Sequence, residues 1–425
     1  MGAVAHLAKM IDREHCARLA DGFAVAAAVS LPWSTSATGI FLGLWLIVLI
    51  PTLDAALLRR VLMTPAGGLP VLLWVAAFAG MLWAVDVPIL DRLNALKPFH
   101  KLLFIPLLMM HFRRSERGLW VMLGFGLSCL VMLPVSWAIN LLPGVLPWPF
   151  VSRGGAGVLV KDYIAQSAEF TVCILLLLAI ALRAWQEHRR LFAVGLVLLA
   201  LVFLANILAV TTSRTALVVI PVLILVFAAK HLSLKTTLGL VAALAIVSAA
   251  AWMLESNLKQ NVTNAMNEVR KFDSGGASTR AGERLEYWKK SIELVADAPL
   301  IGYGTGSIRD QFRRKAEGQS GMASLVTSNP HNQTFAVAIQ LGFLGTTVLF
   351  AIWIAHVLLF SGAGFAAWAG LVITIQNIVG SLFNSHLFDF THGWGYVIGV
   401  GVAAGVVFKN QPLSMAASSR EARSP

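Results

Sequence analysis

The sequence predicts an all-α polytopic membrane protein, and three observations lead to this prediction. Of the 425 residues, 57% are hydrophobic and only 13% are charged. The apolar residues come in runs that are long enough to cross a bilayer. Segments of about ten residues with alternating polarity are absent, so helices rather than barrel strands are expected to satisfy the backbone within the hydrocarbon.

About twelve transmembrane helices are expected. The first follows a charged leader without a convincing cleavage site, so it is expected to be retained as a helix. Several runs are short for a full crossing, and some helices are therefore expected to be broken or tilted. With boundaries good to roughly three residues, the expected spans are 17–33, 36–54, 69–86, 98–111, 118–142, 162–182, 190–209, 213–229, 233–253, 331–356, 362–380 and 392–408.

These spans divide the chain into four parts. Residues 1–253 hold the first nine helices, 254–330 form one large polar loop, 331–409 hold the last three helices, and 410–425 form a small polar tail that is expected to be disordered. Lys and Arg in the short loops favour a cytoplasmic location for both termini, which places the large loop on the periplasmic side. The net charge of +12 is then partly topological, and it indicates anionic lipid headgroups rather than nucleic acid.

The large loop contains a predicted helix, AGERLEYWKKSIELVADAP. Leu285, Trp288, Ile292 and Val295 recur every three or four residues and predict its apolar face, and Pro299 is expected to end it.

The next segment, LIGYGTGS, contains Gly302, Gly304 and Gly306. A dinucleotide-binding loop would need a preceding strand and a following helix in one βαβ unit, and neither is predicted. These glycines are therefore expected to shape the backbone.

His331 lies where the chain enters the tenth expected span, in SNPHNQTFAVAIQLGFLG. Ser328 or Asn329 is expected to cap the helix, and Pro330 suits its first position. His331 would then lie in the first turn, where the helix dipole disfavours a protonated ring, so a neutral imidazole able to accept a proton is expected. A histidine that merely tolerates the membrane interface is the simpler alternative.

Arginines are expected to accompany this histidine. Arg214 follows the potential caps Thr212 and Ser213 at the outer end of a span, and Arg280 and Arg284 are four residues apart on one face of the loop helix. Each could instead lie on a solvated or interfacial surface. Guanidinium groups bind phosphate oxygens bidentately and a neutral histidine can deprotonate a hydroxyl, so the combination fits displacement of a phosphate leaving group.

A second polar cluster is NSHLFDFTHGW, in which His386, Asp389 and His392 are three residues apart. On a helix they would share a face like a zinc site, but structural zinc usually requires four ligands, so no metal is expected. Asp389 is expected to pair with an arginine or orient a sugar hydroxyl, and His386 is the rival base. Asp86 and Asp91, in the second outer loop, are weaker candidates.

Three segments together resemble the O-antigen ligase and polymerase superfamily of bacterial envelope enzymes. They are SRT at 213–215, the Arg284-to-Trp288 spacing followed by APLIGYGTGS at 298–307, and PHNQTFAVAIQLGFLG at 330–345. Their order and spacing carry the resemblance, and within the superfamily the chain most resembles the ligases. The resemblance implies a GT-C-type fold in the bacterial inner membrane and an inverting, metal-independent glycosyltransferase without a cofactor.

The resemblance also implies roles and substrates. Arg214 and Arg284 match the family's pyrophosphate-binding arginines, with Arg280 as a nearby competitor, and His331 matches its proposed base. Asn332 follows His331 as in the family motif and is expected to order the helix entrance. The implied substrates are O-antigen polysaccharide on undecaprenyl pyrophosphate and the lipid A core oligosaccharide, and inner-membrane lipids would surround the enzyme.

Other functions remain open at this point. A polymerase or a protein O-oligosaccharyltransferase of the same superfamily would differ mainly in the acceptor. A transporter or flippase for lipid-linked sugars would instead place ionisable residues near the middle of its spans. The spans are nearly free of charge, which favours chemistry at one membrane face.

Overall fold

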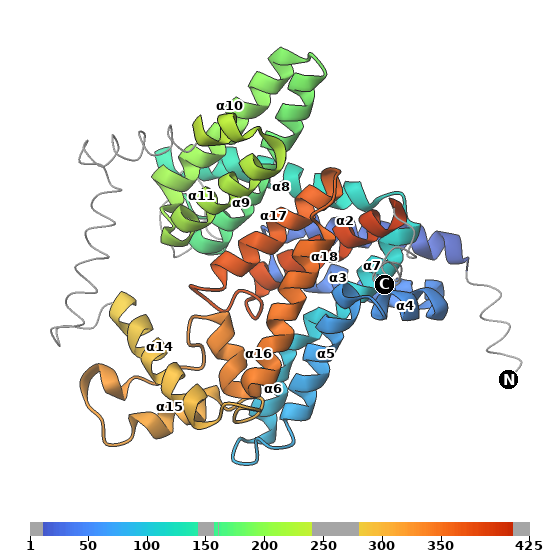
Figure 1. Cartoon of the computed structure of the whole chain (residues 1–425). Coiled ribbons are helices and arrows are strands. Elements are labelled where there is room, and N and C mark those ends of the chain that lie inside the picture. The colour runs from blue at the N-terminus through green and yellow to red at the C-terminus, as the bar shows by residue number, and fades with distance from the viewer. Residues whose placement is uncertain (1–11, 143–156, 160, 240–279, 411–425) are drawn as a thin grey trace, which may run out of the picture.

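A computed structural model describes residues 12–142, 157–159, 161–239 and 280–410 (Figure 1). The described part is helical and contains no strand. Its helices are α2 (Arg13–Ser30), α3 (Thr35–Leu49), η1 (Ile50–Thr52), α4 (Ala55–Leu62), α5 (Pro65–Gly80), α6 (Ile89–His100), η2 (Lys101–Leu103), α7 (Phe104–Arg114), α8 (Gly118–Leu141), α9 (Tyr163–Gln186), α10 (Arg190–Asn206), η3 (Ile207–Thr211), α11 (Arg214–His231), α14 (Arg280–Asp297), α15 (Ile308–Ala316), η4 (Gly321–Ser324), α16 (Gln333–Leu359), α17 (Phe365–Gly380) and α18 (Phe390–Asn410).

Seven of the described helices are long and apolar enough to cross a membrane. They are α3 with η1, α8, α9, α10 with η3, α11, α16 and α18. The pair α4 and α5, bent by 85°, would add an eighth if it forms one broken span. This confirms an all-α polytopic membrane protein, with fewer complete spans among the described residues than the expected twelve.

The difference has local causes. The expected span 98–111 is divided among α6, η2 and α7, and α17 has only 16 residues, about 24 Å at the helical rise. Charged residues populate α2, which packs against α3 and α8. The expected span 233–253 and the tail lie mostly outside the described residues.

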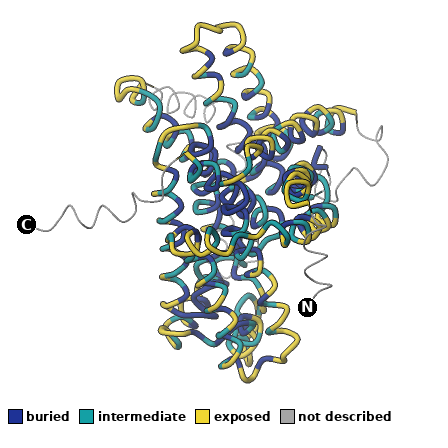
Figure 2. Tube along the Cα trace, turned by 90° about the vertical axis from the view of Figure 1, so that its right-hand side faces the viewer, coloured by how far each residue is buried: buried dark blue, intermediate teal, exposed yellow. Residues whose placement is uncertain are grey.

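Apolar side chains cover much of the outer surface. Figure 2 shows buried residues concentrated where helices pack together and exposed residues toward the ends of the molecule. Among the exposed side chains are Ile47 (63%), Val131 (58%) and Leu198 (56%), each within a candidate span. Lipid rather than water is the medium that accommodates such side chains without cost.

The helix α16 is broken at Gly342, which has φ 60° and ψ −155°. The loop that precedes α15 fills the break, since the amides of Phe343 and Leu344 donate to the carbonyls of Pro299 and Leu300 at 2.7 and 3.2 Å. A Cβ on Gly342 would come within 2.4 Å of the Leu300 carbonyl. A left-handed backbone and this close approach both require glycine.

The predicted role of the glycine-rich loop is confirmed. Gly302, Gly304 and Gly306 have φ of 64°, 89° and 94°. The loop donates back to the other side of the break, from the amides of Tyr303 and Gly304 to the carbonyls of Ile339 and Gln340, both at 2.9 Å. It thereby connects the segment carrying α14 and α15 to the N-terminal half of α16.

The loop helix is confirmed as α14, which ends before Pro299, but its predicted apolar face is confirmed only in part: Val295 packs against the core, whereas Ile292 does not. Ile292 is 60% exposed, whereas Tyr287, Lys290 and Leu294 are buried. Lys290 reaches the core because its ammonium group donates to the carbonyls of Ala323 and Leu325. Tyr287 and Leu294 pack with Phe312 and Ile339, so tertiary partners rather than the apolar spacing select the buried face.

Candidate active site

Arg214 begins α11, directly after a sharp reversal of the chain. The π-helical turn η3 ends α10, Thr212 takes a left-handed conformation with φ 45°, and the Ser213 hydroxyl caps α11 by accepting from the amide of Ala216 at 3.4 Å. The predicted Ser213 cap is therefore confirmed. The arginine is exposed at the positive end of a helix dipole, a position that suits an anionic ligand better than a second cation.

Arg284 lies half-buried on α14, beside two histidines. Burial lowers the pKa of both His331 and His386, and the positive charge of Arg284 lowers both further. The same helix contacts His331 through Tyr287, whose ring stacks on the imidazole with centroids 6.1 Å apart. Arg280 is the first residue of α14, and its side chain lies outside the described part of the structure.

The predicted start of α16 is wrong, because Asn332 caps it. The Asn332 side chain accepts from the amides of Thr334 and Phe335 at 2.9 and 3.2 Å, so Pro330 and His331 precede the helix. His331 has φ 54°, a left-handed conformation stabilised because its amide donates to the Asn329 side chain at 2.9 Å. The lowered pKa agrees with the expected neutral ring, but burial is its main cause.

The tautomer of His331 follows from its contact with Asn384. The Asn384 Oδ1 accepts from the backbone amide of Ser385 at 3.0 Å, which identifies this atom as the oxygen. His331 Nδ1 lies 3.1 Å from the same oxygen and must therefore be the protonated nitrogen. The lone pair is left on Nε2, the atom that a general base would use.

The cluster His386, Asp389 and His392 is arranged differently from the prediction. Only His392 is helical, at the start of α18, while His386 and Asp389 belong to the preceding turn. Asp389 accepts from both the amide and Nδ1 of His392 at 3.0 Å, so it pairs with a histidine and not with an arginine among the described residues. Although burial opposes it, these hydrogen bonds keep the pKa of Asp389 below its usual range.

The two imidazole rings of this cluster are stacked, with centroids 3.9 Å apart and planes 12° apart. In the part of the chain that is described, no group of three or more His, Cys, Asp or Glu side chains could hold a metal ion. Burial and repulsion from His392 lower the pKa of His386 well below its usual value.

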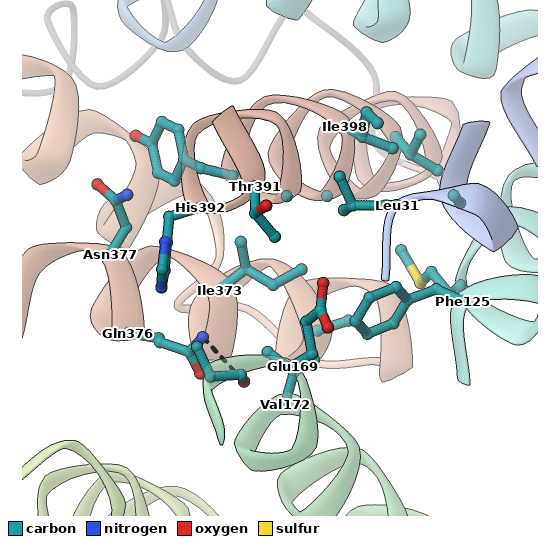
Figure 3. A pocket seen from close by; sticks show the side chains of 18 of the residues that line it. Leu31, Phe125, Glu169, Val172, Ile373, Gln376, Asn377, Thr391, His392 and Ile398 are labelled. Atoms are coloured by element: carbon teal, nitrogen blue, oxygen red, sulfur yellow. Dashed lines mark hydrogen bonds between the residues drawn. The ribbon is translucent and has the colours of Figure 1, made fainter. Parts of the chain in front are cut away.

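A cavity of about 90 Å³ lies between α2, α8, α9, α17 and α18 and borders this cluster (Figure 3). Its walls are mostly apolar, including Leu31, Phe125 and Ile373, but one end is polar. Several buried polar atoms there lack a hydrogen-bond partner among the described residues: Glu169 Oε1, Gln376 Oε1, Asn377 Oδ1, both ring nitrogens of His386 and His392 Nε2. Buried polar groups are normally paired, so this end of the cavity is suited to a polar ligand or water.

His386 connects this cavity to the start of α11. A smaller cavity is lined by His386 and Gln376 together with Ser213 and Thr215, the neighbours of Arg214. The structure thus links His331 through Asn384 to the turn that carries His386, and the Ser213–Thr215 segment lines a cavity with His386.

Sequence reasoning missed Asn384, Glu169 and Lys101. Asn384 stands in the quoted NSHLFDFTHGW segment, but nothing in its spacing indicates a contact with His331. Glu169 is an exception to the expected charge-free spans, a carboxyl group that a scan for acidic residues inside apolar runs would have found. Lys101 is buried, and its ammonium group donates to the carbonyls of Phe388 and Asp389, which fixes the turn before α18.

The weaker candidates are separated. Asp86 pairs with Arg314 at 2.8 Å, whereas Asp91 lines a groove that Asn329 and Asn384 also line.

The fold and site together define a helical membrane protein with His331 before α16 and His386 before α18, and with the two candidate arginines on α11 and α14. Residues 199–351 match a family model described as O-antigen ligase, a range that includes Arg214, α14 and the break in α16. This match supports membership of the O-antigen ligase and polymerase superfamily. No curated protein matches the chain.

Proposed function

We propose that the chain is an inverting, metal-independent glycosyltransferase that moves O-antigen polysaccharide from undecaprenyl pyrophosphate to the lipid A core oligosaccharide. The observation that carries this proposal is the hydrogen bond that holds Nδ1 of His331 and leaves Nε2 for a proton, on a ring that stacks on Tyr287 of α14, the helix that carries the half-buried Arg284. A permanent cation for the leaving group and a base for the nucleophile are the two groups that such a transfer needs.

The proposed reaction uses each group once. His331 Nε2 accepts the proton of the acceptor hydroxyl. The hydroxyl oxygen forms a bond to the anomeric carbon of the donor sugar, from the face opposite the pyrophosphate. The bond between that carbon and the phosphate oxygen breaks, and the electron pair leaves with undecaprenyl pyrophosphate. Arg284 and Arg214 stabilise the departing charge, so no acid or metal is required.

In this proposal, the lipid part of the donor enters the mostly apolar cavity only after a local opening of its walls. His386 is among its polar lining residues, and its apolar walls extend between α8 and α18. At about 90 Å³ it is too small for a drug-sized ligand, let alone a whole isoprenoid chain. The α8–α18 walls would have to separate to admit the first isoprene units.

We extend the proposal to the number of membrane spans and to the side of the membrane that the site faces. Twelve spans in a GT-C-type fold would sit in the bacterial inner membrane with both termini in the cytoplasm. The site would face the periplasm beneath the loop 254–330, and the parts 1–253 and 331–409 would form the membrane domain.

An assay with purified protein in lipid nanodiscs, lipid A core and undecaprenyl-pyrophosphate glycan tests the proposal. Arg284→Ala and Arg214→Ala are each expected to reduce kcat by about 10²–10³-fold, because each removes charge stabilisation from the leaving group. Arg183→Ala is the matched control, since Arg183 is 78% exposed near the opposite end of α9 and pairs with Glu187. A chelator is expected to leave the rate unchanged.

Other outcomes would redirect the proposal. Growth of the glycan without lipid A would indicate a polymerase, and attachment to serine or threonine a protein transferase. Movement of the donor across the bilayer without transfer, dependent on Glu169, would indicate a flippase. Full activity of both arginine variants would end the pyrophosphate assignment.

A further inference from the structure

A polar groove of about 490 Å³ lies beside the proposed site, between α6, α15 and the segments that precede α16 and α18. This volume is within the range of pockets that bind small molecules or a few sugar rings. Its polar lining side chains include Asp91, Asn94, Arg309, Asn329, Asn384 and Asp389.

Some polar groups of the groove are already used by the fold. The Gln340 amide accepts from the amide of Gly306 and donates to the Ala336 carbonyl at 2.8 and 2.7 Å. Arg313 pairs with Asp310 at 3.0 Å. These contacts hold the walls in place.

Other groups of the groove are exposed. Asp91 and Arg309 lie on the first turns of α6 and α15, and Arg309 forms no ion pair with any described residue. Asn94 lies one turn further along α6, where its Oδ1 accepts from Lys97 Nζ at 2.8 Å. Phe388 adds an apolar ring at the inner end of the groove. Carboxylate, amide and guanidinium groups around one aromatic ring match the hydroxyl groups and apolar faces of a saccharide.

The groove meets the proposed base through a shared wall. Asn329 and Asn384 both line the groove, and on their other side they bind the amide and Nδ1 of His331. Arg284 and the Ser213–Thr215 segment do not line the groove, and the Ser213–Thr215 segment instead lines a cavity with His386. The Asn329–Asn384 pair therefore lies between the groove and His331, and the proposed phosphate-binding residues lie outside the groove.

We infer that this groove binds the acceptor saccharide, with its sugar hydroxyls held by Asp91, Asn94 and Arg309. In an inverting displacement, the nucleophile approaches from the face opposite the leaving group. The acceptor must therefore enter from the side away from Arg214 and Arg284, the proposed pyrophosphate-binding residues. The inference rests on the proposed function, because that function supplies the acceptor.

Two tryptophan variants test the groove by filling it. Asn94→Trp places a large ring in the groove, and Leu93→Trp places the same ring on the adjacent position of α6, where Leu93 is 45% exposed and does not line the groove. Asn94→Trp is expected to raise the KM for lipid A core by at least about tenfold, the equivalent of 1.4 kcal/mol, and to leave the KM for the lipid-linked donor unchanged. Leu93→Trp is expected to change neither.

A second pair of variants tests the groove if Asn94→Trp fails to fold. Arg309→Ala should raise the acceptor KM, whereas Arg314→Ala, on the same helix but paired with Asp86, should not. An increase in the donor KM alone, or no change in either variant of the groove, would overturn the inference.

Direct binding separates this inference from the proposed function. Deacylated lipid A core oligosaccharide is titrated into the full-length protein in nanodiscs, without donor. If wild-type protein binds it and Asn94→Trp does not, the groove assignment stands even where no transfer is detected. If the wild type transfers glycan while Asn94→Trp binds and reacts normally, the transferase stands and the groove assignment fails.

Discussion

Two histidine-bearing segments meet at the site, and their hydrogen bonding differs. In the base segment (Ser328–Asn332), His331 is half-buried, its amide and Nδ1 are bound by asparagine side chains, and Nε2 is left for chemistry. In the turn Ser381–Asp389, His386 is 2% exposed and neither ring nitrogen has a partner among the described residues. A fixed tautomer suits a base, whereas unpaired buried nitrogens suit a wall that a ligand completes.

The largest expected effect separates these two roles. His331→Ala should reduce kcat by about 10²–10⁴-fold, the usual contribution of a general base. His386→Ala should retain most of kcat and raise the KM for the donor, because it removes a cavity wall and not the proton acceptor. Steady-state kinetics with both substrates varied will measure this, and a larger kcat loss in His386→Ala would reverse the assignment.

An intermediate effect is expected at Asn384, the residue that orients the base. Asn384→Leu should reduce kcat by about 10²-fold, because the ring loses its fixed tautomer and direction while the hydrophobic side chain fills the same volume. Asn384→Asp keeps an oxygen for Nδ1–H and should recover most of the rate. Equal losses in both variants, with unchanged thermal unfolding, would mean that Asn384 has no positioning role.

The smallest effect concerns pH. A base works when deprotonated, and burial holds the pKa of His331 below its ordinary 6.5, so kcat/KM should stay constant on acidification until the pH falls below 6.5. In Asn384→Asp the added carboxylate favours the imidazolium and raises the pKa, so activity should be lost at a higher pH than in the wild type. Profiles of kcat/KM against pH for both proteins will show the shift. If both proteins lose activity at the same acidic pH, the contact between residue 384 and His331 is contradicted.

Part of the site could be predicted from local sequence. The Ser213 cap, the helix over 280–297 and the backbone role of the loop glycines follow from propensities that act within a few residues. The cap of α16 could not be placed, because Ser328, Asn329 and Asn332 are all acceptable caps and the choice depends on contacts with Leu382 and Asn384. The buried face of α14 likewise depends on Phe312 and Ile339 rather than on its own apolar spacing.

The sequence by itself determined that this is a helical membrane protein with a polar segment carrying arginines next to a histidine, since hydrophobic run length and residue spacing are properties of neighbouring residues. Only the tertiary structure decided that Gly342 breaks α16 to receive the loop from Pro299. It also decided that Asn384, 53 positions from His331, selects the tautomer, and that Glu169 faces the same cavity as two histidines. Such contacts arise from helices packed across the bundle, and no periodicity within a single segment records them.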